Sequence, residues 1–351
     1  MNRFWHETIS ELTPYTPGEQ PINRPQLKLN TNENPFGPSP KVIDAIKENI
    51  NAELRLYPDP ESEDLKKTLA QYYHLSKQSV FVGNGSDEVL AFIFQAFFQG
   101  KKLLFPDITY SFYPVYCKLF SIDYKLIPLE ENFDINLEKY NLEHGGVIFP
   151  NPNAPTGIPM NLNCISDFLH KNQNTIVVVD EAYVDFGTDS ALCLIEEFDN
   201  LIVTQSFSKS RSLAGLRVGC AFAQPELIEA ISRVKNSFNS YPLDRLAQAA
   251  AIAAIQDENY FKKTTKKIID ARGFLEQELE NMNFNVLPSG ANFVFTCHTT
   301  CHAKHIFEQL RSHGILVRYF IKPNRIENFI RITIGTKIQM QTLAKVLKQI
   351  I

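Results

Sequence analysis

A lysine of this sequence lies among hydroxyl groups and arginines. The segment SFSKSRSLAGLR (residues 206–217) places Lys209 between serines, with Arg211 and Arg217 farther along. A solvated surface patch is the simplest explanation for such a segment. The alternative is a lysine whose amine is joined covalently to a phosphorylated cofactor, with hydroxyls and a guanidinium that bind the phosphate. Other motifs of the chain bear on this choice.

An anion-binding pattern occurs earlier in the chain. The segment VGNGSDE (residues 82–88) follows a predicted strand and begins a predicted helix. Its glycines permit close approach of the backbone, and the amides of Gly85, Ser86 and Asp87 would face an anion at the positive end of the helix. A tight turn with a capping residue is the ordinary alternative. This motif alone therefore does not establish an anion site, and other motifs are needed to support one.

Two more polar side chains follow a predicted strand. Asp180 comes directly after the apolar run IVVV (residues 176–179), and a carboxylate there needs a partner because an isolated buried charge is costly. A helix cap or a core salt bridge would also supply that partner. Tyr183 lies three residues on, so a short turn would bring its hydroxyl beside the carboxylate. The loop NPNAPTG (residues 151–157) likewise follows a predicted strand.

The apolar runs predict an α/β fold with a large, mostly parallel sheet flanked by helices. Several runs lack alternation, which indicates strands covered on both faces. A helical stretch over 245–282 then leads to a smaller C-terminal α+β part. We expect an N-terminal arm over 1–30, a large cofactor-binding domain over 31–240 and a small domain over 241–351. The predicted strands are 79–83, 101–106, 123–129, 146–150, 175–183, 200–208 and 217–223, with further strands near 291–297, 314–320 and 329–335.

Composition argues against several classes of protein. The net charge is −4 without a cluster of like charges, so neither nucleic acid nor an anionic membrane is expected as a partner. No apolar run is long enough for a membrane span, and the N-terminus lacks the pattern of a secretory signal. Six scattered cysteines suit reduced thiols in a cytoplasm. The segment CHTTCH (residues 297–302) is expected to hold loop or helix-start residues rather than metal ligands.

Four strand ends thus offer an anion site, an acid, a phenol and a lysine among hydroxyls. Ligands of open α/β sheets bind at this edge. Pyridoxal 5′-phosphate needs such a set: a lysine amine for covalent attachment, an acid for the pyridine nitrogen, a phenol or amide for the ring hydroxyl, and an arginine with hydroxyls for the phosphate. The sequence therefore favours a pyridoxal-phosphate site built from Lys209, Asp180, Tyr183 and Arg217.

At these residues the chain resembles a known family. It is similar to the fold-type I pyridoxal-phosphate aminotransferases, and most similar to those that act on histidinol phosphate. Single motifs are weak, but their order and spacing together are specific. They are LNTNENPFGPSP (29–40), LYPDP (56–60), GNGSDEVL (83–90), FPDITYSFY (105–113), NPNAPTG (151–157), VVVDEAYVDF (177–186), SFSKSRSLAGLRVG (206–219), LVRYF (316–320) and IRITIG (330–335).

The resemblance implies a role for each of these residues. Lys209 would be the covalently linked lysine, Asp180 the partner of the pyridine nitrogen and Tyr183 the ligand of the ring hydroxyl, while Tyr110 would stack on the ring. The chain would be one subunit of a homodimer with the site at the interface. The cofactor phosphate would be bound by Gly85, Ser86, Ser206, Ser208 and Arg217, helped by Tyr57 of the second subunit.

The resemblance also implies the reaction. A cytoplasmic enzyme of histidine biosynthesis would convert histidinol phosphate and 2-oxoglutarate reversibly into imidazole acetol phosphate and glutamate. Arg318 and Arg331 would bind the phosphate or carboxylate of the alternating substrates; without the resemblance, solvated charges at strand ends would be expected. The family pattern has Asn immediately before PTG, where this chain has Ala154. Asn153 would replace the missing amide, or Tyr183 would make that contact alone.

Three alternatives stay open at this point. An aromatic-amino-acid aminotransferase would share the cofactor residues and differ in its substrate pocket. A pyridoxal-phosphate decarboxylase acting on threonine phosphate has a similar fold. A cofactor-binding regulator without catalysis is the third, and the intact set of Lys209, Asp180 and Arg217, with no appended DNA-binding segment, argues against it.

Overall fold

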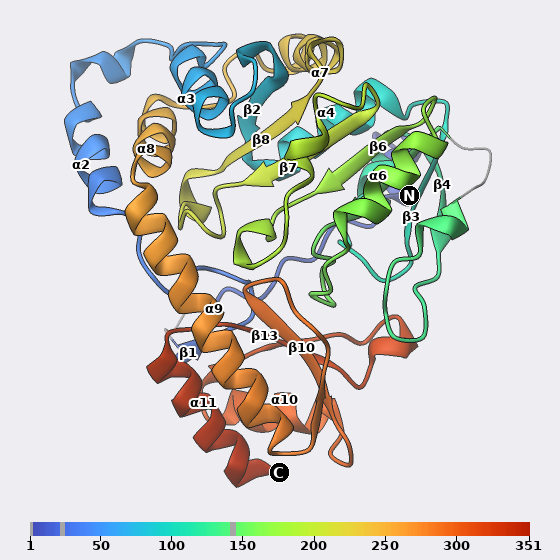
Figure 1. Cartoon of the computed structure of the whole chain (residues 1–351), viewed down its shortest axis with the longest axis vertical. Helices are drawn as coiled ribbons and strands as arrows, with labels where there is room; N and C mark the ends of the chain where they lie inside the picture. The colour runs from blue at the N-terminus through green and yellow to red at the C-terminus, as the bar shows by residue number, and fades with distance from the viewer. Residues whose placement is uncertain (1–2, 22–24, 141–144) are drawn as a thin grey trace.

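The computed structural model describes residues 3–21, 25–140 and 145–351, with a large sheet above a smaller one (Figure 1). Residues 1–2 and 22–24 of the predicted arm lie outside the described residues. Within these ranges, no helix is long and apolar enough to cross a membrane. The α-helices are α1 (Glu7–Glu11), α2 (Pro40–Asn49), α3 (Glu63–Tyr73), α4 (Gly85–Phe97), α5 (Tyr113–Leu119), α6 (Leu162–Lys171), α7 (Pro225–Phe238), α8 (Arg245–Gln256), α9 (Glu258–Glu280), α10 (Ala303–Ser312) and α11 (Lys337–Ile350).

The large sheet is mostly parallel, as predicted. Among the described residues seven strands follow the order β2-β8-β7-β6-β5-β3-β4, and β8 runs antiparallel to both of its neighbours. The carboxyl ends of β5, β6 and β7 therefore meet at one edge of the sheet. The strands are β2 (Val80–Asn84), β3 (Lys102–Pro106), β4 (Asp123–Ile127), β5 (Gly146–Pro150), β6 (Ile176–Asp180), β7 (Leu201–Ser206) and β8 (Val218–Ala223).

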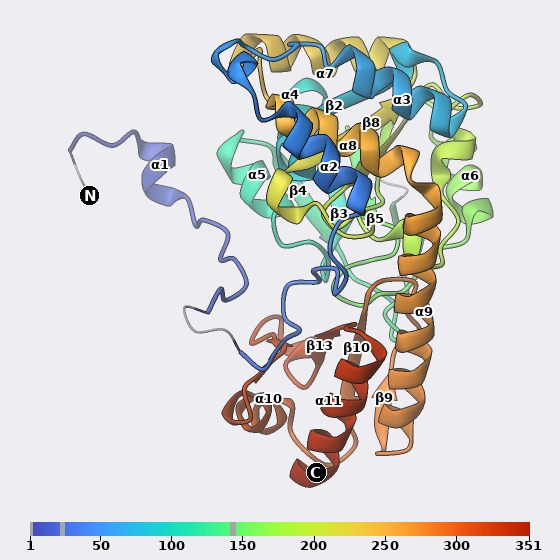
Figure 2. The same cartoon turned by 90° about the vertical axis from the view of Figure 1, so that its left-hand side faces the viewer.

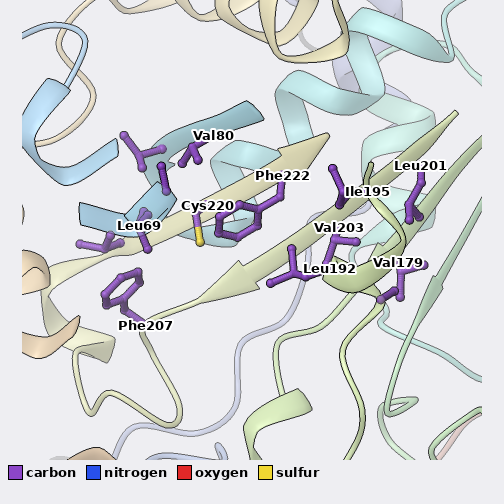
Figure 3. Packing of buried hydrophobic residues seen from close by; sticks show 14 of the residues in the cluster. Leu69, Val80, Val179, Leu192, Ile195, Leu201, Val203, Phe207, Cys220 and Phe222 are labelled. Atoms are coloured by element: carbon purple, nitrogen blue, oxygen red, sulfur yellow. The ribbon is translucent and has the colours of Figure 1, made fainter. Parts of the chain in front are cut away.

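Helices cover both faces of this sheet, which explains the apolar runs. Val177 and Val179 of β6 pack into the cluster beside α2, α3, α6 and α8, and part of that cluster is drawn in Figure 3. Val178, between them, packs on the opposite face with α4, α5 and α7. Side chains alternate between the faces of a strand, so a strand buried on both sides must be apolar at every position.

The C-terminal part contains an antiparallel sheet of order β12-β13-β10-β9 within the described residues. Its strands are β9 (Phe284–Val286), β10 (Phe293–His298), β12 (Arg318–Tyr319) and β13 (Ile330–Thr333). Helices α9, α10 and α11 share its apolar core, and α9 runs from the large sheet down past the small one (Figure 2). In addition, β1 (Leu27–Lys28) pairs in parallel with β11 (Ile315–Leu316), which fastens the N-terminal segment to this part.

The helical stretch predicted over 245–282 is divided into α8 and α9. Asp257 between them has φ −97° and ψ 61°, outside the helical region, and its carboxylate accepts a hydrogen bond from Ser39. Helix α8 packs on α2 and α3 beside the large sheet. The predicted domain bounds at 1–30, 31–240 and 241–351 place α8 with the small domain, so we propose instead that the boundary lies at Asp257.

A buried carboxyl group lies next to the predicted acid Asp180, at the end of β6. Glu181, directly after β6, is 2% exposed. Its carboxylate accepts hydrogen bonds from Ser190 Oγ (2.6 Å), the Ala191 amide (2.6 Å) and Gln205 Nε2 (2.9 Å). Burial is the largest cause that raises the pKa of Glu181, to about 7. The folded chain therefore holds a proton there that the unfolded chain releases near pH 4.5.

This proton predicts a pH dependence of stability. Because the folded state binds more protons than the unfolded state between pH 4.5 and 7, stability must fall as the pH rises through that window. The contribution is on the order of 3 kcal/mol at 1.36 kcal/mol per pH unit. Denaturant unfolding of cofactor-free protein across this window should give a shallower pH slope for Glu181→Gln than for the native chain. The exposed Glu258→Gln serves as control, and an unchanged slope in Glu181→Gln would contradict the assignment.

Candidate active site

A cavity of about 350 Å³ opens where the carboxyl edge of the large sheet faces the small sheet. Pro150, Asp180 and Ser206 line it from the ends of β5, β6 and β7, and Ser86 lines it from the start of α4. The N-terminal segment adds a wall. Of the residues predicted from sequence, the structure brings into this lining Ser86, Asp87, Tyr110, Asp180, Tyr183, Ser206, Ser208, Lys209, Arg217, Arg318 and Arg331.

Lys209 lies just beyond β7, on a loop held by the N-terminal segment. Its Nζ donates a hydrogen bond to the Thr31 carbonyl (3.2 Å) and lies 5.7 Å from the centre of the Tyr183 ring. Asn34 Nδ2 donates to the carbonyls of Lys209 (2.9 Å) and Ser210 (3.2 Å). The amine thus enters the cavity from a loop whose backbone is tied in place.

Asp180 supplies a buried acid at the end of β6. It is 5% exposed, and it accepts hydrogen bonds from Tyr113 Oη (2.9 Å) and the Ala182 amide (3.3 Å). Burial outweighs these bonds and raises the pKa of Asp180 to about 6. A cationic group placed in the cavity would favour the ionised carboxylate, so this acid is suited to a positively charged partner.

The geometry of the predicted anion site at the start of α4 depends on two glycines. A Cβ on Gly219 would lie 2.3 Å from the Ser86 nitrogen, and one on Gly85 would lie 2.5 Å from Arg217 Nη2. Gly85 also has φ +80°, which L-residues rarely adopt. Gly85 therefore stays behind the cavity lining and lets Arg217 approach it. The guanidinium contacts Ser208 Oγ at 3.5 Å.

Asp87 contributes its side chain as well as the amide expected from the sequence. Its carboxylate accepts hydrogen bonds from Arg217 Nη2 (3.0 Å) and from Tyr110 Oη (2.8 Å). The carboxylate therefore joins the predicted phosphate ligand Arg217 to the predicted stacking ring Tyr110. Ser206 is engaged nearby, because its Oγ accepts from the Ser208 amide (3.1 Å).

Two arginines of the small sheet face the same cavity. Arg318 and Arg331 are directly opposite each other in the β12–β13 pair, an arrangement of like charges that destabilises a sheet. Desolvation lowers the pKa of Arg331, and Arg318 acts in the same direction. Within the described part of the chain, Arg331 Nε is buried without a hydrogen-bond partner. Such a pair is suited to binding an anion.

Besides Gly85, two other predicted residues, Asn153 and Tyr57, lie outside this cavity lining. Asn153 is 1% exposed, and its Nδ2 donates to the Ile108 carbonyl (3.0 Å) and to Thr156 Oγ1 (3.1 Å). Its amide is used to hold its own loop, so the expectation that it replaces the amide missing at Ala154 does not match its position. Tyr57 is 78% exposed and is likewise outside the lining of its own chain's cavity.

The structure adds residues that sequence reasoning missed. Asn32 Nδ2 donates to the Tyr183 hydroxyl (3.0 Å), and Tyr113 bonds Asp180 as described. Tyr15 lines the cavity and stacks on Phe112 with ring centres 4.7 Å apart. Asn32 lies in the motif LNTNENPFGPSP, but the motif does not by itself indicate that its side chain bonds Tyr183. For Tyr15, no local pattern in the sequence gives a signal.

Comparison with known proteins agrees with this geometry. A family model described as aminotransferase class I and II matches residues 24–350. The chain belongs to this family. The predicted aminotransferase fold, with its mostly parallel sheet and smaller antiparallel sheet, is thereby confirmed.

Named relatives of this aminotransferase extend over its whole length. It is 54% identical to histidinol-phosphate aminotransferase 1 of Hydrogenovibrio crunogenus, with 100% of this chain and 99% of that protein covered. It is 51% identical to the histidinol-phosphate aminotransferase of Clostridium beijerinckii, covering 100% and 98%. The crystal structure of the Sinorhizobium meliloti histidinol-phosphate aminotransferase in complex with pyridoxal-5′-phosphate superposes with a TM-score of 0.88, at 26% identity and with 99% and 97% covered.

Arg318 and Arg331 lie opposite each other, so we expect this pair to lower the stability of the protein while it favours the binding of an anion. Arg331→Met should raise the free energy of unfolding of the ligand-free aminotransferase by about 1 kcal/mol, because it removes a desolvated charge beside a like charge. Inorganic phosphate should raise the thermal midpoint of the native protein more than that of the variant. Calorimetry with and without phosphate measures both effects. Arg311→Met, which breaks the exposed pair with Glu19, is the control, and a destabilised Arg331→Met with normal phosphate protection would refute the argument.

Proposed function

We propose that this aminotransferase binds pyridoxal 5′-phosphate and transfers the amino group of histidinol phosphate to 2-oxoglutarate, yielding imidazole acetol phosphate and glutamate. The full-length similarity to histidinol-phosphate aminotransferases supports the substrate assignment. The observation that carries most weight is the pair Arg318 and Arg331, held side by side at the cavity that also contains Lys209 and Asp180.

The residues of the cavity fit the proposed cofactor by their chemistry. The buried acid Asp180, with its raised pKa, has the character needed beside a pyridinium nitrogen. Lys209 presents an amine for covalent attachment to an aldehyde, and the Tyr183 hydroxyl is available for the ring oxygen with Asn32 bonded to it. The close approach permitted by Gly85 and Gly219 brings Arg217 and strand β8 against the start of α4, where backbone amides would bind phosphate oxygens. Ser86, Ser206, Ser208 and Arg217 would complete the phosphate site, and Tyr110 would stack on the ring.

The cofactor, when bound, supplies a ring that withdraws electrons from the carbon that carries the substrate's amino group. The amino group of the substrate would first displace the Lys209 amine from the aldehyde carbon. The freed amine of Lys209 is then suited to move the proton at the substrate carbon, because its Nζ lies inside the cavity on a tethered loop. Thr31 orients the amine through its carbonyl. The arginines hold the anionic end of the substrate, and Tyr15 covers the cavity on the side of the N-terminal segment.

The choice of substrate follows from charge. Histidinol phosphate has no carboxylate, so its phosphate is its strong anionic group. Planar guanidinium groups bind a phosphate through paired hydrogen bonds. The same two arginines can accept the carboxylates of glutamate in the second half of the reaction. This explains how one cavity would serve two substrates of different shape.

We also propose that the active unit is a homodimer and that it works in the cytoplasm. Tyr57 lies on the surface, away from its own cavity. Its ring stacks on the exposed Tyr241, and Leu54 and Leu56, which precede it in the chain, are exposed as well. Exposed apolar side chains of this kind suit contact with a second copy. The cytoplasmic location rests on the six cysteines, all of which are unpaired.

A substrate panel tests the proposed reaction. Histidinol phosphate should be the best amino donor to 2-oxoglutarate, whereas unphosphorylated histidinol should be poor. Arg318→Ala should raise the KM for histidinol phosphate roughly tenfold to a hundredfold, since a charged hydrogen bond contributes about 1.5–3 kcal/mol, and it should change the KM for histidinol little. Arg311→Ala is the matched control. Faster reaction with phenylalanine, or release of carbon dioxide from threonine phosphate, would replace the proposed activity by one of the alternatives.

A second test concerns the acid. Asp180→Asn keeps the shape of the side chain but removes its negative charge, so kcat should fall roughly a hundredfold or more, and the cofactor should dissociate more readily during dialysis. Absorbance of the dialysed protein and steady-state rates measure the two effects. Asp270→Asn, at an exposed position on α9, is the control. Normal turnover by Asp180→Asn would remove the assigned role.

A further inference from the structure

The segment that carries Tyr57 is an irregular loop tied to two helices. Residues 56–62 lie between a 3₁₀ turn (Ala52–Arg55) and α3. The Tyr57 side chain projects into solvent, and its ring stacks on Tyr241 with centres 4.7 Å apart and planes inclined by 23°. An exposed loop of this kind would ordinarily sample many conformations. Here the side chains of α7 and α8 restrain it through its backbone.

Arg245, the first residue of α8, holds the start of the loop. Its Nη2 donates to the Tyr57 carbonyl at 2.9 Å, and its Nε contacts the Leu56 carbonyl at 3.5 Å. Its Nη1 lies 3.8 Å from Glu53 Oε2, which directs the guanidinium toward the loop. The planar fork of an arginine can contact two successive carbonyls in this way, whereas the single ammonium of a lysine fixes one less rigidly.

Other side chains hold the far end of the same loop. Lys235 of α7 is 2% exposed, and its Nζ donates to the Pro60 carbonyl (2.8 Å) and to the Glu61 carboxylate (2.9 Å). Gln248 of α8 contacts the Asp59 carbonyl through Nε2 at 3.3 Å. A buried lysine must have such partners to be tolerated. The loop is therefore restrained on both sides of Tyr57.

We propose that Arg245 is a positioning residue for Tyr57 and acts on the active site of the second subunit. The proposal rests on the proposed dimer, in which Tyr57 reaches the phosphate of the cofactor bound by its partner. A tyrosine on a loose loop would lose conformational freedom each time the cofactor binds. A loop already fixed by Arg245 avoids that loss. The effect of Arg245 on cofactor binding should then appear in the partner's cavity and not in its own.

Cofactor titration of single variants gives the first part of the test. Arg245→Ala should weaken binding of pyridoxal 5′-phosphate about tenfold, the scale of one charged hydrogen bond, with little change in the thermal midpoint of the cofactor-free protein. Arg245→Lys should fall between this variant and the native chain. Arg233→Ala, which removes an exposed arginine of α7 paired with Glu229, should bind normally. Native affinity in Arg245→Ala would overturn the proposal.

Hybrid dimers give the decisive part. A Lys209→Ala subunit with a native loop is paired with an Arg245→Ala subunit, and two different affinity tags isolate the hybrid. In this hybrid only the cavity of the Arg245→Ala subunit contains Lys209. By the proposal, that cavity receives Tyr57 from the native loop of the Lys209→Ala subunit. Borohydride trapping at increasing cofactor concentration counts the labelled Lys209 peptide. Half-maximal labelling of the hybrid should require the same cofactor concentration as half-maximal labelling of the native dimer. A tenfold higher requirement in the hybrid would mean that Arg245 acts within its own chain, which overturns the inference.

Tyr57→Phe separates this inference from the proposed function. If Tyr57→Phe weakens cofactor binding and Arg245→Ala does not, the shared site stands and the positioning role is wrong. If Tyr57→Phe binds the cofactor as the native protein does, the shared site itself is wrong, and the positioning role is overturned with it. Neither result bears on the amino-donor specificity, which is assigned to Arg318 and Arg331 of the small sheet.

Discussion

A carboxyl group at the end of a strand buried on both faces is the constraint on which the cavity depends. Asp180 is largely shielded from bulk water. Tyr113 and Ala182 compensate its charge only in part, so that burial still raises its pKa to about 6. Parallel pairing places the ends of β5 and β7 on either side of it. Whatever fills the cavity meets this acid and Lys209 together, and a ligand with a cationic ring relieves the cost of burying the acid.

The opposite wall is built by a segment far away in sequence. The Asn32 amide donates to Thr333 Oγ1 (2.9 Å), and the Asn292 side chain donates to the Asn32 carbonyl (3.0 Å), so this segment is bonded to the small sheet. The same segment reaches the large sheet through Asn34, which holds the backbone of the Lys209 loop. The amine is thus positioned by contacts about 175 residues away along the chain. Closing such long loops is costly in entropy, and only the packed fold sustains them.

Sequence reasoning located the residues that stand directly after apolar strands, because strand ends in a parallel sheet share an edge. Asp180 and Lys209 are predicted in this way, and both line the cavity. It failed where a side chain's partner is set by tertiary packing. Asn153 shares its loop with Ala154, which does line the cavity, yet its amide is turned toward Ile108. Tyr15 reaches the cavity only because the N-terminal segment crosses it, and no local pattern contains that information.

The cavity places charges of both signs in unfavourable positions. Arg318 and Arg331 face each other across two strands, the buried Nε of Arg331 lacks a partner among the described residues, and Asp180 sits in low dielectric. In each case a complementary charge would restore the balance: an anion between the arginines and a cation beside the acid. Asp87 already supplies such compensation to Arg217, so a phosphate arriving there must share or displace that carboxylate. The proposed cofactor and substrate carry charges of the required sign at both places, so their binding would stabilise the folded protein.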